Sequence, residues 1–232
     1  MSQKKVLIVW GGWEGHEPGK CAAIVEKTLV EEGFVVAKEN QTSVFADSNL
    51  ARFDLIIPII SMGNIADAES KNLSAVVESG VGLAGFHGGM GDSFRLNTDY
   101  QFMTGGQWVA HPGNIISYRI NIVDKSDPIT AGIEDFTYES EQYYMHVDPS
   151  NHVLAKTTFS GDHCSWIKGV QMPVVWKRMH GRGKVFYSSL GHRPSEFAVY
   201  EMAMLLRRGM LWAAREENGD NRNGARPRVK VA

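Results

Sequence analysis

The sequence has little cysteine, little excess charge and no long run of apolar residues. Only Cys21 and Cys164 carry thiols among 232 residues, which excludes a disulfide-stapled scaffold and favours a reducing compartment. Lysine and arginine number 24 against 26 aspartate and glutamate, so charge gives no reason to expect nucleic acid or a membrane as partner. No segment approaches the ~18 apolar residues of a membrane helix, and the opening residues lack a signal-peptide pattern. We therefore expect a cytoplasmic protein with a small-molecule ligand.

Near-continuous apolar runs are the main structural signal in the sequence, because strands buried on both faces have this pattern. The runs are VLIVW (6–10), DLIIPII (54–60), VGLAGF (81–86) and KVFYSSL (184–190). Stretches with helical spacing of apolar residues occur at 18–33, 65–80 and 194–217. This alternation predicts a doubly wound α/β fold, with a mainly parallel sheet and helices on both of its faces.

The pattern changes between about 114 and 180, where strand-like segments follow one another without helical runs. We interpret this region as an antiparallel edge or insertion within the same domain, which spans 1–216. The last residues, 217–232, are polar and rich in glycine, and they predict a flexible C-terminal tail.

Glycine-rich turns follow several of the predicted strands and carry many of the chain's histidines. The ligand crevice of an open α/β sheet lies beyond the carboxyl ends of its strands, so residues directly after the strands are candidates for a binding site. Histidines at three strand ends form the centre of this prediction, with aromatic and amide side chains beside them. The candidates are Trp13, His16, His87, Gln107, Trp108, His111 and His192.

A further segment, ESEQYYMHVDP at 139–149, adds three carboxylates, two tyrosines and a histidine. Glu141 is the candidate partner of the strand-end histidines. In an extended chain Tyr144, His146 and Asp148 would share one face, and which face looks inward stays open. Other residues have surroundings typical of plain surface or core positions and are expected outside the site. These are Cys21, His152, His163 and His180.

Five separated motifs together resemble the ThuA-like proteins of trehalose utilisation. They are GGWEGHEP (11–18), GFHGG (85–89), GGQWVAHPG (105–113), EQYYMHVDP (141–149) and VFYSSLGH (185–192). The resemblance runs from about residue 4 to 215. It implies a three-layer α/β fold similar to flavodoxin and the class I glutamine amidotransferases, and a place in bacterial disaccharide and keto-sugar metabolism.

The resemblance does not imply amidotransfer. Class I amidotransferases place a nucleophilic cysteine in a Gly-x-Cys-x-Gly turn, and the corresponding stretch here is GFHGG, with His87 in the cysteine position. His192 falls where the catalytic histidine of those enzymes follows its strand. We therefore expect the turn to be kept and His87 to act as a base or a ligand.

Two enzyme mechanisms and one binding role remain open. In the first mechanism His87 and His192 transfer protons with help from Glu141, since imidazole titrates near neutral pH. In the second, two or three of four histidines, with or without Glu141, bind a divalent ion such as Zn²⁺, although no HxH or HExxH spacing supports it. The possible metal ligands are His16, His87, His111 and His192. The expected carbohydrate contacts are Trp13, His16, Gln107, Trp108, His111, Tyr144 and His146.

The third hypothesis is a non-catalytic module that binds a carbohydrate or a partner protein on an amidotransferase-like fold without the nucleophile. A surviving cluster of titratable groups argues against it. No cofactor is firmly predicted, and whether the protein forms a homo-oligomer is open.

Overall fold

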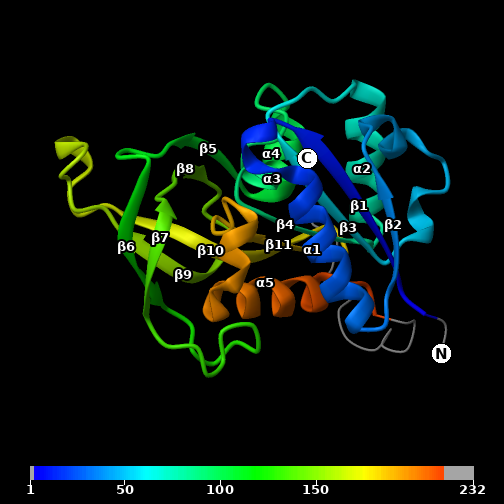
Figure 1. The fold of residues 1–232 in the computed structure, drawn as a ribbon. Coiled ribbons are helices and arrows are strands. Elements are labelled where there is room, and N and C mark those ends of the chain that lie inside the picture. The colour runs from blue at the N-terminus through cyan, green and yellow to red at the C-terminus, as the bar shows by residue number, and fades with distance from the viewer. Residues whose placement is uncertain (1–2, 217–232) are drawn as a thin grey trace, which may run out of the picture.

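A nine-stranded sheet forms the centre of the computed structural model, which describes residues 3–216 (Figure 1). The expected flexible tail, 217–232, lies outside the described residues. In spatial order the strands are β2 (Val35–Glu39), β1 (Lys5–Gly12), β3 (Leu55–Ser61), β4 (Gly82–Phe86), β11 (Gly183–Ser188), β10 (Gln171–His180), β9 (His152–Thr158), β6 (Ile115–Ile122) and β7 (Phe136–Glu141).

The sheet has a parallel half and an antiparallel half. Strands β2, β1, β3, β4 and β11 are paired in parallel. From β11 onward every pairing, through β10, β9, β6 and β7, is antiparallel. The antiparallel strands fall almost entirely within 115–180, which confirms the predicted α/β fold with an antiparallel addition. A separate two-stranded sheet, β5 (Gly106–Ala110) with β8 (Tyr144–Val147), was not predicted.

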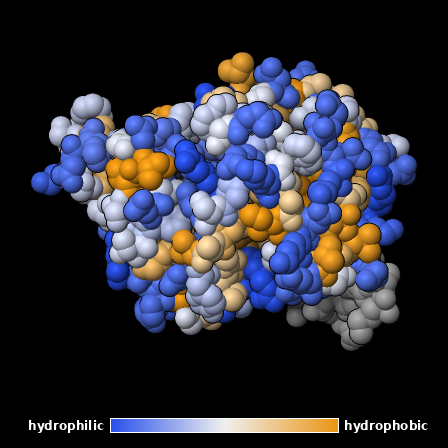
Figure 2. Space-filling view, viewed as in Figure 1, coloured by the Kyte–Doolittle hydropathy of each residue, from blue (hydrophilic) through white to orange (hydrophobic). Residues whose placement is uncertain are grey.

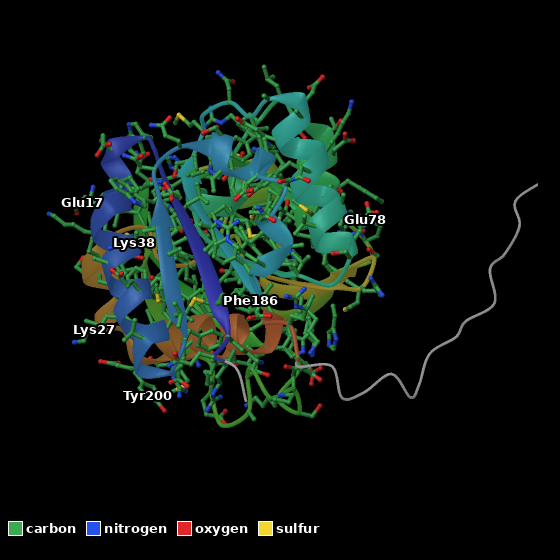
Figure 3. All side chains as sticks on the ribbon, turned by 90° about the vertical axis from the view of Figure 1, so that its right-hand side faces the viewer. Glu17, Lys27, Lys38, Glu78, Phe186 and Tyr200 are labelled. Carbon is green, nitrogen blue, oxygen red and sulfur yellow. The ribbon has the colours of Figure 1, made fainter. Side chains whose placement is uncertain are left out.

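Helices cover both faces of the parallel half, as the alternation predicted. On one face lie α1 (Pro18–Glu31) and α5 (Tyr200–Ala213); on the other lie α2 (Asp67–Glu78) and α4 (Thr98–Thr104). Figure 3 shows α1 and α2 on opposite sides of the strands. Helix α1 starts at a proline, which is well placed in a first helical turn because its missing N–H needs no partner there.

Alternating side chains of the strands divide the core into two layers. In β1, Val6 and Ile8 pack into the cluster that contains α1 and α5, whereas Leu7 and Val9 pack into the cluster that contains α2 and α4. Each fully buried aliphatic side chain of this kind stabilises the fold by about 1.5–3 kcal/mol relative to an exposed one. The carboxyl ends of the parallel strands are therefore held in fixed positions from both sides.

The predicted helix at 194–217 is shorter in the structure. Residues Pro194–Ala198 form a 3₁₀ turn, Val199 is extended, and α5 begins at Tyr200. The cause is Glu196, whose carboxylate accepts hydrogen bonds from the Tyr138 hydroxyl, the Ser140 hydroxyl and the backbone N–H of His192. These bonds fix the segment before α5 as a loop across the end of the sheet.

Hydrophobic and hydrophilic residues are interspersed on the face of the molecule seen in Figure 2. Within residues 3–216, none of the helices has both the length and the apolar composition needed to cross a lipid bilayer.

Candidate functional site

A tight turn after β4 presents the imidazole of His87. The backbone of His87 has φ 46° and ψ −142°, a conformation that costs a residue with a side chain on the order of 1–3 kcal/mol, and the short helix α3 (Gly88–Gly91) follows at once. Neighbouring groups hold this conformation: the His87 N–H donates to the Ser188 carbonyl at 2.6 Å, and the Tyr187 hydroxyl donates to the His87 carbonyl at 3.0 Å. Strain that is kept in this way indicates a functional position.

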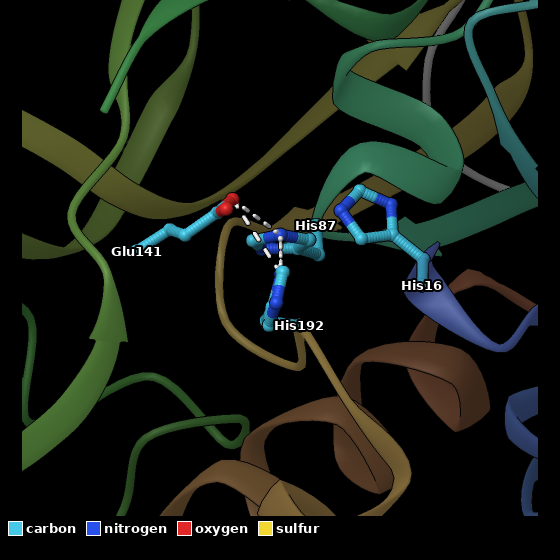
Figure 4. Close-up of side chains that lie close together, drawn as sticks. All are labelled: His16, His87, Glu141 and His192. Carbon is cyan, nitrogen blue, oxygen red and sulfur yellow. Dashed lines mark hydrogen bonds and ion pairs between the residues drawn. The ribbon is translucent and has the colours of Figure 1, made fainter. Parts of the chain in front are cut away.

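Three other side chains meet His87 from different parts of the chain (Figure 4). His16 comes from the turn after β1, His192 from the turn after β11, and Glu141 is the last residue of β7. One donor atom from each of the four residues lies within 4.8 Å of the donor atoms of the other three. We call these four residues the His–Glu cluster. Imidazole nitrogens and a carboxylate oxygen are groups that transfer protons or bind divalent metal ions.

His87 is the centre of the cluster. Its Nε2 lies 3.1 Å from Nδ1 of His192 and 3.2 Å from Oε2 of Glu141, and the hydroxyl of Tyr143 reaches the same atom at 2.7 Å. On the other side of the ring, Nδ1 lies 2.9 Å from the carbonyl oxygen of Ser189. A carbonyl only accepts hydrogen bonds, so Nδ1 carries the hydrogen, and in the neutral ring Nε2 presents a lone pair to the cluster.

His16 completes the cluster from the side of β1. Its Nδ1 is hydrogen-bonded to the hydroxyl of Ser61, the last residue of β3, which leaves Nε2 as the atom available to a ligand. The His16 ring centre lies 4.9 Å from the ring centres of both His87 and His192. The ring fits here because Gly88 has no side chain: a Cβ at that position would lie 2.6 Å from Cε1 of His16.

Burial and mutual charge shape the electrostatics of the cluster. The pKa of His16 falls from 6.5 to about 3. Burial is the largest cause, and repulsion from the neighbouring His87 and His192 adds to it. Burial acts to raise the pKa of Glu141, but the close contacts with His192 and His87 outweigh it and bring that pKa below its ordinary value. Near neutral pH the cluster therefore contains an ionised carboxylate and a neutral His16 imidazole.

Three further residues expected from the sequence lie beside the cluster. His111 Nε2 is 3.7 Å from Oε1 of Glu141, and its ring faces that of Trp108 at 5.5 Å. The indole of Trp13 meets His16 edge-on at 4.7 Å and is 47% exposed. Because His87, His192 and Glu141 are buried, the partly exposed rings of His16 and His111 mark the side from which a ligand can approach.

Other predicted contact residues point elsewhere. The structure places His146 on the exposed side of β8, and the ring of Tyr144 packs against Phe159 at 5.7 Å. The side-chain amide of Gln107 donates to the carbonyl of Trp108 at 3.0 Å. Side chains alternate between the two faces of β8, as predicted. The face that carries Tyr144 and His146 does not contact the cluster; the residue that does is Tyr143, directly before the strand.

Several residues at the site were not among the predicted ones. Tyr143 contacts His87, and Ser61 and Ser189 orient the two imidazoles through hydrogen bonds. Arg95 forms a two-point ion pair with the buried Asp92, at 2.6 and 2.8 Å, and lies over the ring of Trp108. Ser61 was within reach of sequence reasoning, since it directly follows the predicted strand at 54–60. Ser189 acts through its backbone carbonyl, which no side-chain pattern reveals.

Neither cysteine belongs to the cluster. Cys21 is buried in α1, and its thiol donates to the carbonyl of His16 at 3.4 Å. Burial is the main cause that raises its pKa to about 12, so the thiol is not ionised near neutral pH. Cys164 lies in the loop between β9 and β10 and contacts the core that contains α2.

We expect Cys164→Ala to keep ligand turnover and thermal midpoint close to those of the wild type. Cys21→Ala should keep turnover as well, but it removes a buried group and should lower stability by about 1–2 kcal/mol. Paired measurements of thermal unfolding and turnover check both variants. Loss of turnover in a folded Cys21→Ala protein would show that the thiol takes part in the chemistry.

The family and fold comparisons agree with one another. The family model described as ThuA, trehalose utilisation, matches residues 5–213. Comparison with the curated proteins finds no match. A ThuA-like protein from Bacteroides uniformis shares the fold with a TM-score of 0.75 at 19% identity, over 90% of this chain and 91% of that one. For a ThuA-like protein from Parabacteroides merdae the TM-score is 0.72 at 16% identity, over 95% and 94% of the two chains.

A cytoplasmic protein from Salmonella typhimurium LT2 is also similar. Its TM-score is 0.63 at 13% identity, and the match covers 91% of this chain and all of that one. At these identities the three likenesses establish the fold, which is the mixed α/β architecture described above.

Proposed function

Because this chain belongs to the ThuA family, whose description is trehalose utilisation, we propose that it is an enzyme of carbohydrate metabolism that acts on a disaccharide or a keto-sugar. The His–Glu cluster would be its catalytic centre. One observation carries this proposal: three histidines and a glutamate from four distant segments converge on one point where the parallel strands end. Convergence of titratable groups at this edge of an α/β sheet is typical of an active site.

The chemistry of sugars suits these groups. Cleaving or rearranging a sugar requires that a proton be taken from one oxygen or carbon and given to another, and that negative charge on oxygen be stabilised. An imidazole with a free lone pair, such as His87 Nε2, can accept a proton, and an ionised carboxylate such as Glu141 can support the imidazolium that results. The Tyr143 hydroxyl, 2.7 Å from His87, offers a neutral hydrogen-bond donor at the same point.

Aromatic rings beside the cluster support a carbohydrate ligand. Trp13 is 47% exposed although it contacts His16, and Trp108 lies beside His111. An exposed indole next to buried polar groups offers a flat apolar surface on which the C–H face of a sugar ring can stack, while its hydroxyls bond to the histidines.

Glutamine amidotransfer does not fit this site. The chemistry needs a thiolate in the turn after β4, where this chain has His87, and Cys21 is buried in α1 with a raised pKa. The runner-up is therefore a non-catalytic module that holds a carbohydrate. The strained backbone of His87 and its buried contacts with two titratable side chains favour an enzyme, because binding a neutral sugar does not require them.

The test is a turnover screen of the purified protein on trehalose, other disaccharides and their 3-keto forms, with His192→Ala as the disabled variant. We expect turnover of at least one of these sugars and a decrease of about 10²–10⁴-fold in the variant. His152→Ala, on the exposed part of β9, is the matched control. Tight binding of a sugar, measured by calorimetry, without turnover by the wild type would favour the non-catalytic module.

A further inference from the structure

We infer that the His–Glu cluster is a binding site for one divalent transition-metal ion, with Zn²⁺ the first choice, and that His87, His192, Glu141 and His16 are its protein ligands. The inference deepens the proposed function and rests on it in one respect, because the ion would lie in the proposed catalytic centre. The geometry, the orientation of the rings and the type of donors each support it.

The distances between donor atoms match those of a metal site. His87 Nε2, His192 Nδ1 and Glu141 Oε2 are separated by 3.1, 3.2 and 3.5 Å. In a tetrahedral zinc site with bonds of about 2.0–2.1 Å, two ligand atoms lie about 3.3–3.4 Å apart. A point about 2 Å from all three atoms therefore exists. His16, whose donor lies within 4.8 Å of the others, can close the set with a small side-chain shift.

The rings are oriented as metal ligands are. Metal-binding histidines almost always donate their second N–H to a carbonyl, a carboxylate or water, which fixes the tautomer. His87 does this through Nδ1 to the Ser189 carbonyl, and His16 is held through Nδ1 by the Ser61 hydroxyl. In both residues the remaining nitrogen, Nε2, is the one available to an ion in the cluster.

Electron-pair donors face one another in the cluster, and a positive charge between them would stabilise this arrangement. The lone pair of His87 Nε2 and the carboxylate of Glu141 approach to 3.2 Å in a buried place, which is unfavourable between two acceptors. A single proton can be shared by two of these acceptor atoms, whereas a divalent cation can accept electron pairs from all of them at once. The Tyr143 hydroxyl also reaches Nε2, so an ion that takes this lone pair frees the hydroxyl to bond to a ligand of the ion.

The donor types select the class of ion. Imidazole with one carboxylate suits Zn²⁺ and its first-row neighbours, whereas Mg²⁺ and Ca²⁺ prefer all-oxygen sites and Cu⁺ prefers sulfur. Among the described residues one other group has suitable donors at short range, namely Asp124, Asp127 and His152. There the carboxylates are already used: Asp127 binds Lys177, and Asp124 accepts from Ser126. This second group serves as a control.

The test measures the ion directly. The purified protein is stripped with a chelator, reloaded with Zn²⁺, and analysed for bound zinc by mass spectrometry, and its affinity is measured by competition with a chromogenic chelator. In parallel, Co²⁺ is added and its visible absorption bands report the coordination number. We expect one ion per chain, and affinity reduced at least tenfold in Glu141→Gln and in His16→Ala. The variant His152→Ala should keep the ion, because His152 is exposed on β9 and is not a proposed ligand.

Two outcomes overturn the inference: a wild-type protein that takes up no Zn²⁺ or Co²⁺, or an affinity that is unchanged in both Glu141→Gln and His16→Ala. Thermal midpoints of all variants separate loss of a ligand from loss of the fold. The inference and the proposed function can fail separately. A wild-type protein that takes up no Zn²⁺ or Co²⁺ but turns over a sugar would remove the ion and keep the enzyme, whereas stoichiometric Zn²⁺ without turnover of any sugar would keep the ion and remove the enzyme.

Discussion

Exchange of His87 for glycine is expected to abolish turnover of the sugar substrate and to give a folded protein that melts at a higher temperature than His87→Ala. Both variants remove the imidazole that contacts His192, Glu141 and Tyr143, so turnover should fall about 10²–10⁴-fold or more in each. They differ only in the backbone. At φ 46° an alanine keeps the strain that the histidine has, whereas glycine adopts this conformation without steric cost.

The size of the difference follows from opposing terms. Relief of strain favours glycine by about 1–3 kcal/mol. The greater freedom of glycine in the unfolded chain costs about 0.5–1 kcal/mol of this, so His87→Gly should be more stable by about 1 kcal/mol. For a domain of this size that corresponds to about 2–4 °C in thermal midpoint. Equal midpoints for the two variants would mean that the turn at His87 relaxes freely and stores no strain.

The strand-end histidines could be predicted from the sequence because an apolar run and a glycine-rich turn follow one another at each of them. The apolar runs that predict β1, β4 and β11 end immediately before glycine-rich turns, and parallel strands bring such turns to one edge of the sheet. His16, His87 and His192 follow these strands and lie together in the structure. The prediction needed only that these strands run parallel, because the carboxyl ends of parallel strands then lie at the same edge of the sheet.

Residues on the antiparallel side were harder to place from sequence. Which face of β8 looks inward depends on its pairing with β5, and neither strand has a strong apolar pattern. Side chains alternate along a strand, so a choice of face that is wrong by one residue exchanges Tyr143 for Tyr144. Glu141 was predicted as a carboxylate partner from the segment 139–149, whereas its contact with His87 joins two residues that are 54 positions apart.

The supporting contacts of the site could not be predicted at all. The Ser189 carbonyl and the Ser61 hydroxyl orient the two rings, and Glu196 fixes the loop before α5 that includes His192. These bonds join residues that are 45 to 102 positions apart or use backbone atoms, so no local pattern contains them. They arise from tertiary packing after the sheet has formed.

A methyl group at Gly88 is expected to disrupt the cluster without removing any of its four side chains. In Gly88→Ala the new Cβ would lie 2.6 Å from Cε1 of His16 and 2.9 Å from the Ser61 hydroxyl, distances at which the side chains must move. His16 would be pushed out of line with His87, and loss of such orienting contacts typically lowers metal affinity or activity by about 10–100-fold. The fold should persist, because alanine is favoured over glycine within a helix such as α3 by about 0.5–1 kcal/mol.

A double-mutant cycle with His16→Ala identifies the cause of this loss. If Gly88→Ala acts by displacing the His16 ring, it should have no further effect once that ring is gone, so the double variant should match His16→Ala in Zn²⁺ affinity and in turnover. If instead the methyl group distorts the turn that carries His87, the two losses should add, because each would then affect a different ligand. Additive losses would therefore show that glycine is required at residue 88 by the backbone of the turn and not by the His16 ring. The distance of 2.6 Å between a Cβ at residue 88 and Cε1 of His16 would then not explain why this residue has no side chain.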